Sequence, residues 1–280
     1  MTAVSLSRRA LLVAGVAIVT LPARGAVPRL SISGALEQGG LAIGHAGDDA
    51  RVRIDGQEAH VAADGTFAFG FAYDRTTPLH VTAIFADGTS ESLECTPAIR
   101  KYEIQHINGL PQQFVTPPPE TIARIRRESA LIGEARTRDT DGLDFVNGFD
   151  WPAPGILSGV FGSQRIDNGV AMAPHFGVDM AAPVGTPIHA PADGVVSISD
   201  DYYLDGGFTL LDHGHGVSTC YLHQSRRIVK AGEAVRRGQL MGLIGRTGRA
   251  TGPHLHWAMN WFQVKLDPSL STRTSAPRRL

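Results

Sequence analysis

The sequence of 280 residues contains only two cysteines, Cys95 and Cys220, which lie far apart. Two thiols can build neither a disulfide scaffold nor a zinc site made of cysteine ligands. An excess of one charge is also lacking, since 26 Lys and Arg face 27 Asp and Glu, and this excludes a strongly cationic nucleic-acid binder. Aromatic residues make up only 7%, whereas Gly (32) and Pro (17) are abundant. This composition favours many short strands joined by turns.

Long apolar runs are absent after the N-terminus, so we expect no integral membrane segment in the mature chain. Residues 1–26 carry an arginine pair (Arg8-Arg9), an uncharged and largely apolar run that ends at Leu21, and small residues before Ala26. These features predict an export signal of the twin-arginine or the ordinary secretory type. The mature protein is therefore expected in the periplasm or cell envelope.

The length allows two domains, and residues 28–100 have the pattern of the first. Apolar and polar residues alternate around Val52 and Phe69, and Asp-Gly pairs punctuate the runs as turns. Short strands of this kind predict a small β-sandwich-like domain. We interpret it as a spacer or a fold-supporting module. A carbohydrate-binding role is the alternative, but no aromatic platform supports it.

Residues 101–150 read as a linker between the two halves. A triple proline ends at Pro119, and apolar residues then recur at steps of three and four, which predicts one amphipathic helix over about 120–138. Several arginines lie between the apolar positions. They indicate a solvated face whose other side is packed.

The second half carries the chemistry, because seven of the eleven histidines follow residue 174. Residues two apart in a strand point to the same face. His254 and His256 should therefore project together from one strand, while Leu255 and Trp257 pack on the opposite side.

The same alternation predicts that Tyr221 and His223 share a face. Cys220 and Leu222 would then lie on the other face, which makes Cys220 a core thiol and not a nucleophile. The remaining histidines of this half are assigned to turns and the surface: His189, His213 and His215.

Imidazole and carboxylate groups without thiolates suit zinc, although the residue types alone leave another divalent ion open. A catalytic zinc site uses three protein ligands and keeps one position open. Two histidines and one aspartate meet that number. The histidines that remain could accept or donate protons beside the metal.

The order of these motifs resembles a known family. His175-x-x-x-Asp179 followed by His254-x-His256 is similar to the metal signature of the lysostaphin/LytM-type zinc metalloendopeptidases, which are murein hydrolases of bacterial cell walls. The match runs over residues 161–268 and includes the stretches 190–196 and 252–257. Each motif is weak alone, but their order and spacing together are specific.

The resemblance implies the ligands and their roles. One zinc ion per chain would be held by His175, Asp179 and His256. His223 and His254 would be the catalytic histidines beside it. The spacing by itself does not decide which member of the 254/256 pair binds the metal.

The resemblance also implies a mainly β fold, with a C-terminal antiparallel catalytic domain over residues 151–268 and the metal on the floor of a groove. Strand patterns at 195–198, 209–211 and 217–222 agree with this expectation. The glycine-rich loop 245–252 should border the groove, and Tyr221 is a weaker candidate for its edge. Residues 269–280, without acidic side chains, are expected to form a disordered basic tail.

The function implied is hydrolysis of peptide cross-links in peptidoglycan. Expected export favours a Gram-negative periplasm, and hence the D-Ala–diaminopimelate bond over glycine bridges. The alternative is a catalytically inactive relative that binds and activates a cell-wall amidase, which the presence of every ligand disfavours. Residues 106–109, or the linker after them, could also lie across the groove and regulate the site. The sequence leaves any protein partners unknown.

Overall fold

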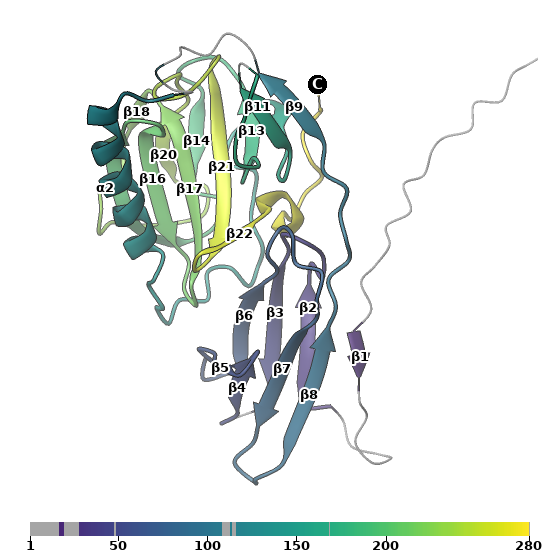
Figure 1. The fold of residues 1–280 in the computed structure, drawn as a ribbon. Coiled ribbons are helices and arrows are strands. Elements are labelled where there is room, and N and C mark those ends of the chain that lie inside the picture. The colour runs from purple at the N-terminus through teal and green to yellow at the C-terminus, as the bar shows by residue number, and fades with distance from the viewer. Residues whose placement is uncertain are drawn as a thin grey trace, which may run out of the picture.

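The computed structural model describes residues 17–19, 28–47, 49–107, 113, 116–167 and 169–279. Apart from residues 17–19, the predicted export signal lies outside the described residues. The structure is mainly β, as expected, with a smaller and a larger β domain arranged end to end (Figure 1). Within the described ranges, no helix has the length and apolar character needed to span a bilayer.

The smaller domain is built from two sheets packed face to face. One has the strand order β1-β8-β7-β4-β5 and the other β2-β3-β6. Their inner faces enclose an apolar core that contains Val52, Phe67, Phe69 and Val81. The strands are β1 (Ala17–Val19), β2 (Leu30–Gly34), β3 (Leu41–Ala46), β4 (Arg51–Ile54), β5 (Gln57–Glu58), β6 (Thr66–Gly70), β7 (Leu79–Ile84) and β8 (Ser90–Cys95).

The larger domain is organised around one antiparallel sheet with the order β10-β13-β21-β17-β16-β15-β19, to which β22 adds beside β21. Its central strands, β16 and β17, are buried along almost their whole length, including their polar residues. The strands are β10 (Ile156–Gly159), β13 (Val178–Ala181), β15 (Gly194–Tyr202), β16 (Gly206–Asp212), β17 (Val217–Gln224), β19 (Ala234–Val235), β21 (His254–Trp261) and β22 (Val264–Leu266).

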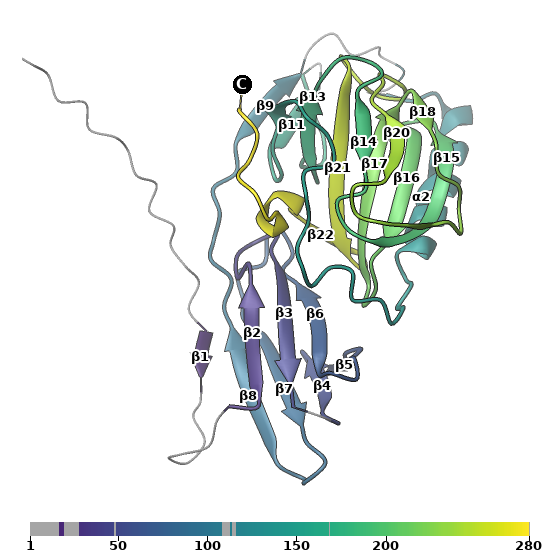
Figure 2. The ribbon, with the colours of Figure 1, turned by 180° about the vertical axis from the view of Figure 1, so that it is seen from behind.

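Two small sheets flank this main sheet. One has the order β14-β20-β18 and packs against one face of the main sheet (Figure 2). The other, β12-β11-β9, joins the linker to the larger domain, because β9 pairs in parallel with β11. The strands are β9 (Ile104–Ile107), β11 (Gln164–Asp167), β12 (Val170–Ala171), β14 (Pro187–His189), β18 (Arg226–Arg227) and β20 (Leu240–Leu243).

The linker helix α2 (Pro119–Ala135) covers part of one face of the main sheet (Figure 1). It begins directly at the triple proline, whose fixed φ suits a first turn that needs no N–H donor. It ends three residues before the predicted end at 138. Ile132 packs against Phe208, Cys220 and Ala258 of the sheet. Two other apolar residues of the helix, Ile122 and Leu131, are exposed, so the buried side of α2 is narrower than the apolar periodicity predicts.

The two domains are joined by apolar and ionic contacts. Leu41 and Ala68 of the sandwich belong to the same core cluster as Leu266 of β22. Arg100 donates to the buried carboxylate of Asp267 at 2.8 Å. These contacts tie the sandwich to β22 and the residue that follows it.

The expected disorder of the basic tail is wrong for the described residues up to 279. A short 3-10 helix, η1 (Pro268–Ser271), starts this segment. Phe149 donates its N–H to Ser271, and the Arg273 guanidinium pairs with Asp150 at 2.7 Å. Farther along, Arg278 accepts a bond from the Leu157 N–H. The tail is ordered because its backbone groups and arginines find partners on the domain.

Candidate metal centre

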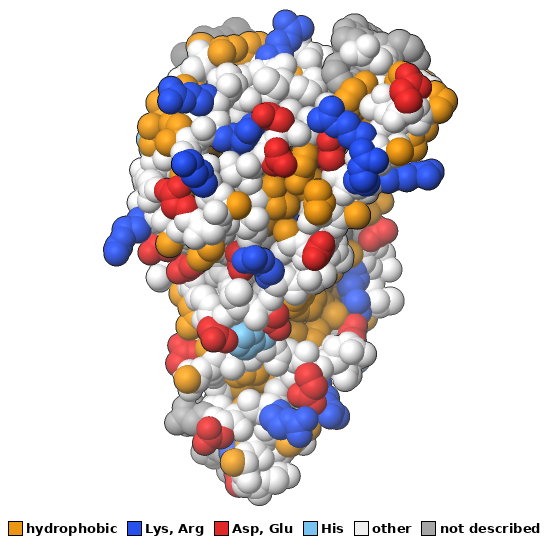
Figure 3. Space-filling view, turned by 90° about the vertical axis from the view of Figure 1, so that its left-hand side faces the viewer, with side chains coloured by type: hydrophobic (Ala, Val, Ile, Leu, Met, Phe, Trp, Pro, Cys, Tyr) orange, Lys and Arg blue, Asp and Glu red, His pale blue; other side chains and the backbone are white. Residues whose placement is uncertain are grey.

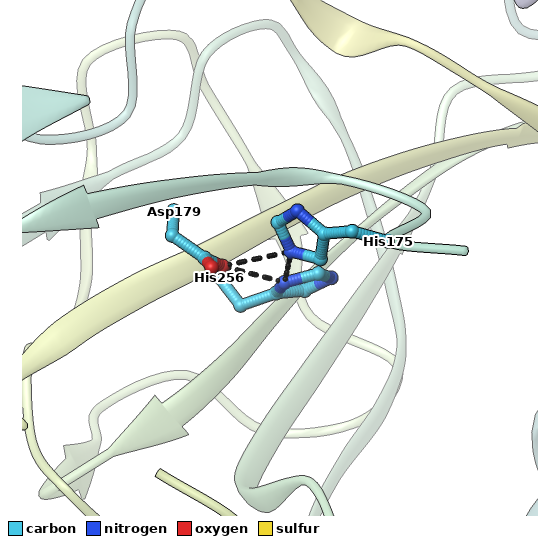
Figure 4. Close-up of side chains that lie close together, drawn as sticks. All are labelled: His175, Asp179 and His256. Atoms are coloured by element: carbon cyan, nitrogen blue, oxygen red, sulfur yellow. Dashed lines mark hydrogen bonds and ion pairs between the residues drawn. The ribbon is translucent and has the colours of Figure 1, made fainter. Parts of the chain in front are cut away.

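The register of two neighbouring strands brings the ligand side chains together. Asp179 of β13 lies directly opposite His256 of β21 in an antiparallel pair. Directly opposed residues have Cβ atoms about 5 Å apart on the same face. His175 lies three residues before β13 and turns back over the pair (Figure 4). Segments 77 residues apart in the chain therefore supply one cluster.

The three side chains point at one another with their ligand atoms. His175 Nε2 lies 3.0 Å from Asp179 Oδ1 and 2.9 Å from His256 Nδ1. His256 Nδ1 lies 2.8 Å from the same carboxylate oxygen (Figure 4). Among the described residues, this is the one group of three or more potential ligands that converges in this way.

The backbone around the cluster orients the His175 ring and leaves room for Asp179 and His256. The Nδ1–H of His175 can donate to the Val160 carbonyl at 3.1 Å, which leaves the Nε2 lone pair facing the cluster. At Gly177 a Cβ atom would lie 2.6 Å from His256 Nε2. At Gly159 it would lie 2.4 Å from Asp179 Oδ2. The two ligands can approach so closely because both positions lack a side chain.

The donor set fits a divalent metal such as zinc. Ligand atoms about 2.0–2.1 Å from a tetrahedral zinc lie about 3.3 Å from one another, close to the separations here. Burial alone would raise the pKa of Asp179, but His175 and Arg165 hold it well below its usual range. Burial lowers the pKa of His256 to about 4, although the hydrogen bond to Asp179 acts to raise it. Both groups are thus deprotonated at neutral pH, the state that binds a metal.

His223 and His254 lie beside the cluster. Their ring centroids are 4.7 Å apart, and His254 Nε2 lies 3.8 Å from Asp179 Oδ1. His254 Nδ1 bonds the Gly252 carbonyl at 2.9 Å, and His223 Nδ1 bonds the Thr247 carbonyl at 2.9 Å. Each contact directs Nε2 away from the backbone. Burial and the neighbouring His254 and His256 lower the pKa of His223 well below its usual value.

The predicted face of His223 is wrong in one respect. His223 has a φ of 65°, so the regular alternation of β17 stops there. Its ring joins Cys220 and Leu222 on the groove side, while Tyr221 is fully buried in the core on the other side. Tyr221 therefore does not border the cleft. Cys220 is a buried thiol, as expected, and burial raises its pKa.

Two other histidines are buried where the sequence analysis expected the surface. His213 is fully buried, with Nδ1 2.6 Å from the Asp193 carbonyl and Nε2 2.7 Å from Thr219 Oγ1. His215 is also buried and stacks on His60 of the sandwich at 4.1 Å. Both do belong to a turn, in which His215 has a positive φ. His189 is half-buried. None of the three contacts the metal-ligand cluster.

Arg165 is the residue that sequence reasoning missed. It lies on β11, and its guanidinium donates to Asp179 Oδ2 at 2.5 Å, on the oxygen that the histidines do not use. A lone arginine ten residues before His175 gives no spacing signal. The contact becomes visible only when β11 is placed beside β13. Of the linker stretch 106–109, His106 lies in β9, and residues 108 and 109 lie outside the described residues.

The segment that contains this site is similar to known proteins. Residues 173–268 match the model of peptidase family M23. Two Vibrio cholerae proteins are similar, the peptidoglycan DD-endopeptidases ShyA (47% identical over 88 residues, 31% of this chain and 20% of the relative) and ShyC (51% over 83 residues, 30% and 19%). The chain thus spans about a fifth of the length of these relatives.

A solved structure extends the similarity beyond the matched segment. A peptidase M23 structure from Pseudomonas aeruginosa is 29% identical and has a TM-score of 0.65, covering 84% of this chain and 93% of the other. That coverage exceeds the larger domain, so the shared fold includes residues before it. The fold and the similar sequences both point to the metallopeptidases as the class that this domain resembles. Residues 173–268 thus resemble peptidase family M23, which confirms the resemblance to the lysostaphin/LytM type.

Proposed function

We propose that this protein is a zinc-dependent endopeptidase that hydrolyses peptide cross-links of bacterial peptidoglycan. The observation that carries the proposal is the convergence of His175 Nε2, Asp179 Oδ1 and His256 Nδ1 within 3.0 Å of one another. The names of the Vibrio cholerae relatives support the substrate class. No feature of the described residues favours the inactive, amidase-activating alternative.

The proposed ligands of one zinc ion per chain are His175, Asp179 and His256. When bound, zinc would supply a Lewis acid that polarises a carbonyl and lowers the pKa of water. The Arg165 guanidinium holds the Asp179 carboxylate in place through its second oxygen. The Val160 carbonyl does the same for the His175 ring.

His223 and His254 are the proposed catalytic histidines. Both have Nδ1 bonded to a backbone carbonyl, so their Nε2 atoms are available on the groove side of the ligand cluster. His223 is neutral at pH 7 because burial and the adjacent imidazoles lower its pKa. A neutral imidazole can accept a proton from the attacking water, and its protonated form can donate to the departing amine.

The finer specificity and the location belong to the same proposal. Export by the segment 1–26 would place the chain in the cell envelope, where peptidoglycan lies. We propose the D-Ala–diaminopimelate bond as the one cut, since the named relatives are DD-endopeptidases.

The test combines metal analysis with digestion of purified sacculi by the full chain. We expect about one zinc per chain and release of uncross-linked muropeptides, identified by mass spectrometry. His256→Ala should lose the zinc and reduce the rate at least ~10³-fold, because removing a ligand removes both metal affinity and catalysis.

His223→Ala serves as the matched variant. It should keep the zinc and still lose activity by about 10²–10⁴-fold, the usual range for a proton-transfer group. Folded wild-type protein that binds no zinc, releases no peptides and stimulates an added amidase would instead support the inactive alternative. Zinc without cleavage of sacculi would overturn the proposed substrate.

A further inference from the structure

The groove beside the metal ligands continues toward helix α2. This cavity has a volume of about 580 Å³, and its walls come from α2, β17, β21, β22 and the loops at 172–176 and 204–205. His175, His223 and His256 lie along it. The other end is covered by α2 and β22, so one continuous space connects the metal cluster to residues that the reaction itself does not use.

The charged lining of this space is predominantly positive. Among the described residues that line it, one is acidic, Asp205, and four are basic: Arg136, Arg165, Arg249 and Lys265. Arg165 is engaged by Asp179 at the metal end. By contrast, basic and acidic side chains are interspersed on the outer face shown in Figure 3. The positive excess is therefore a property of the groove.

Lys265 lies on the floor of the groove. It pairs with Asn260 of β21, and residues opposite one another share a face. Asn260 is four residues from His256, an even number, so Lys265 lies on the same face as the ligand, about 13 Å along the strand. Within the described part of the chain, its ammonium has no hydrogen bond or ion pair, although the residue is partly buried.

Arg136 reaches the same part of the groove from helix α2. It caps the C-terminus of α2, and its Nη2 lies 3.6 Å from Cys220 Sγ. Cys220 is paired with Ala258, two residues from His256, or about 7 Å along β21. Arg136 Nε is buried and has no partner among the described residues. The two cations therefore face one stretch of groove, between about 7 and 13 Å from the ligand.

Holding these cations together costs free energy. Burial and the nearby Arg136 lower the pKa of Lys265 to about 8, while burial raises the pKa of Asp205. Asp205, the acidic side chain among the described residues of the lining, cannot by itself balance both Lys265 and Arg136. Buried charges are usually paired, and an anion that enters from outside would supply the missing partner.

We propose that Lys265 and Arg136 form a subsite that binds a free carboxylate of the substrate peptide. The inference rests on the proposed function and adds a determinant of specificity to it. At about 3.3–3.6 Å per extended residue, a distance of 7–13 Å corresponds to about two to four residues from the scissile bond. A peptide that contains diaminopimelate and is cross-linked through one amine retains free carboxylates at such positions. Their amidated forms would lack the charge and bind more weakly.

The experiment compares two cross-linked peptides, one with free carboxylates and one with the same groups amidated. The zinc-loaded full chain with His223→Ala, which should keep the metal without appreciable cleavage, should bind the free form about tenfold more tightly in calorimetry. Lys265→Gln should raise KM for the free form five- to twentyfold without changing kcat, and leave KM for the amidated form unchanged. Arg136→Gln should act in the same direction. Lys265→Arg should restore most of the preference, because the positive charge returns.

Lys230→Gln is the matched control, since it removes one exposed lysine from the same domain. It should change neither KM. Equal effects of Lys265→Gln on the two peptides, or no effect on either, would overturn the subsite, provided that circular dichroism shows a folded variant. Should the wild type cleave neither peptide, the endopeptidase proposal would fail. The calorimetric preference and its loss in Lys265→Gln would still decide whether the subsite exists.

Discussion

The sandwich and the peptidase domain differ in what they bury. In the described residues of the sandwich, the buried polar side chains are Gln38 and Thr66, and its core is aliphatic and aromatic. The peptidase domain buries many more, including imidazoles and carboxylates: Ser163, His175, Asp179, Thr209, Asp212, His213, His215, Ser218, Thr219, His223, Gln224, Asn260 and Asp267. Since a buried polar group is costly without a partner, this contrast locates the chemistry in the second domain.

The contrast also separates two sources of stability. Ion pairs of the sandwich, such as Arg53 with Glu58 at 2.8 Å, lie on its surface and contribute little. Its stability must come from apolar packing. The peptidase domain combines an apolar core with polar groups whose protonation state matters. We therefore expect the two domains to respond differently to a cavity, to pH and to the loss of a charged partner.

The largest expected effect is a cavity in the sandwich core. Phe69 is fully buried between Phe67 and Phe71. Phe69→Ala should lower the free energy of unfolding by about 3–5 kcal/mol. Thermal unfolding followed by circular dichroism measures this change. The zinc content and the rate per folded molecule should stay unchanged, because every proposed ligand lies in the other domain.

Phe69→Leu is the control, since it keeps most of the volume and should cost less than about 1.5 kcal/mol. A strong loss of activity in Phe69→Ala below its unfolding temperature would show that the sandwich shapes the site. That result would contradict the interpretation of the sandwich as a supporting module.

Much of the site could be predicted from sequence because its order follows from local rules. The alternation within a strand places His254 and His256 on one face, and it holds because β21 is regular there. The same rule fails at His223, whose positive φ ends the alternation. No sequence pattern predicts this positive φ, because it arises where the chain turns into the neighbouring loop.

The parts that the sequence did not predict depend on contacts between distant segments. Arg165 reaches Asp179 only because β11 packs beside the ligand strands. His213 is buried because the Asp193 carbonyl and the Thr219 hydroxyl satisfy both its ring nitrogens. The tail is ordered by partners such as Asp150, more than a hundred residues away. Neither composition nor the spacing of residues predicts these contacts.

A second prediction concerns pH. Burial lowers the pKa of His213 from an ordinary 6.5 to about 4 in the folded chain. The unfolded chain thus binds more protons between these values, so this stabilising contribution is complete above pH 6.5 and lost as the pH falls toward 4. His213→Gln should reduce the change in unfolding free energy between pH 7 and pH 4 by about 3 kcal/mol.

Urea unfolding at each pH gives the comparison. His45→Gln, at an exposed position in the sandwich, is the matched control and should leave the pH dependence as in the wild type. An equal pH dependence in His213→Gln and the wild type would mean that His213 contributes nothing to the difference between the domains.

The smallest expected effect is on zinc affinity. It compares the loss of a buried ion pair in the peptidase domain with the loss of an exposed one in the sandwich. Arg165→Gln should weaken zinc binding about 10–100-fold, the usual range when a partner of a metal ligand is lost. Arg53→Gln removes an exposed arginine that pairs with Glu58 and should leave zinc affinity unchanged.

A readout of zinc affinity against pH distinguishes positioning from a general loss of stability. Arg165 helps to hold the pKa of Asp179 well below its usual range. Without Arg165 that pKa rises, so protons should compete with zinc at a higher pH than in the wild type. Competition with a chelator between pH 4 and pH 8 measures the shift. If Arg165→Gln weakened binding equally at every pH, the guanidinium would only support the fold, and the buried pair would act no differently from the exposed one.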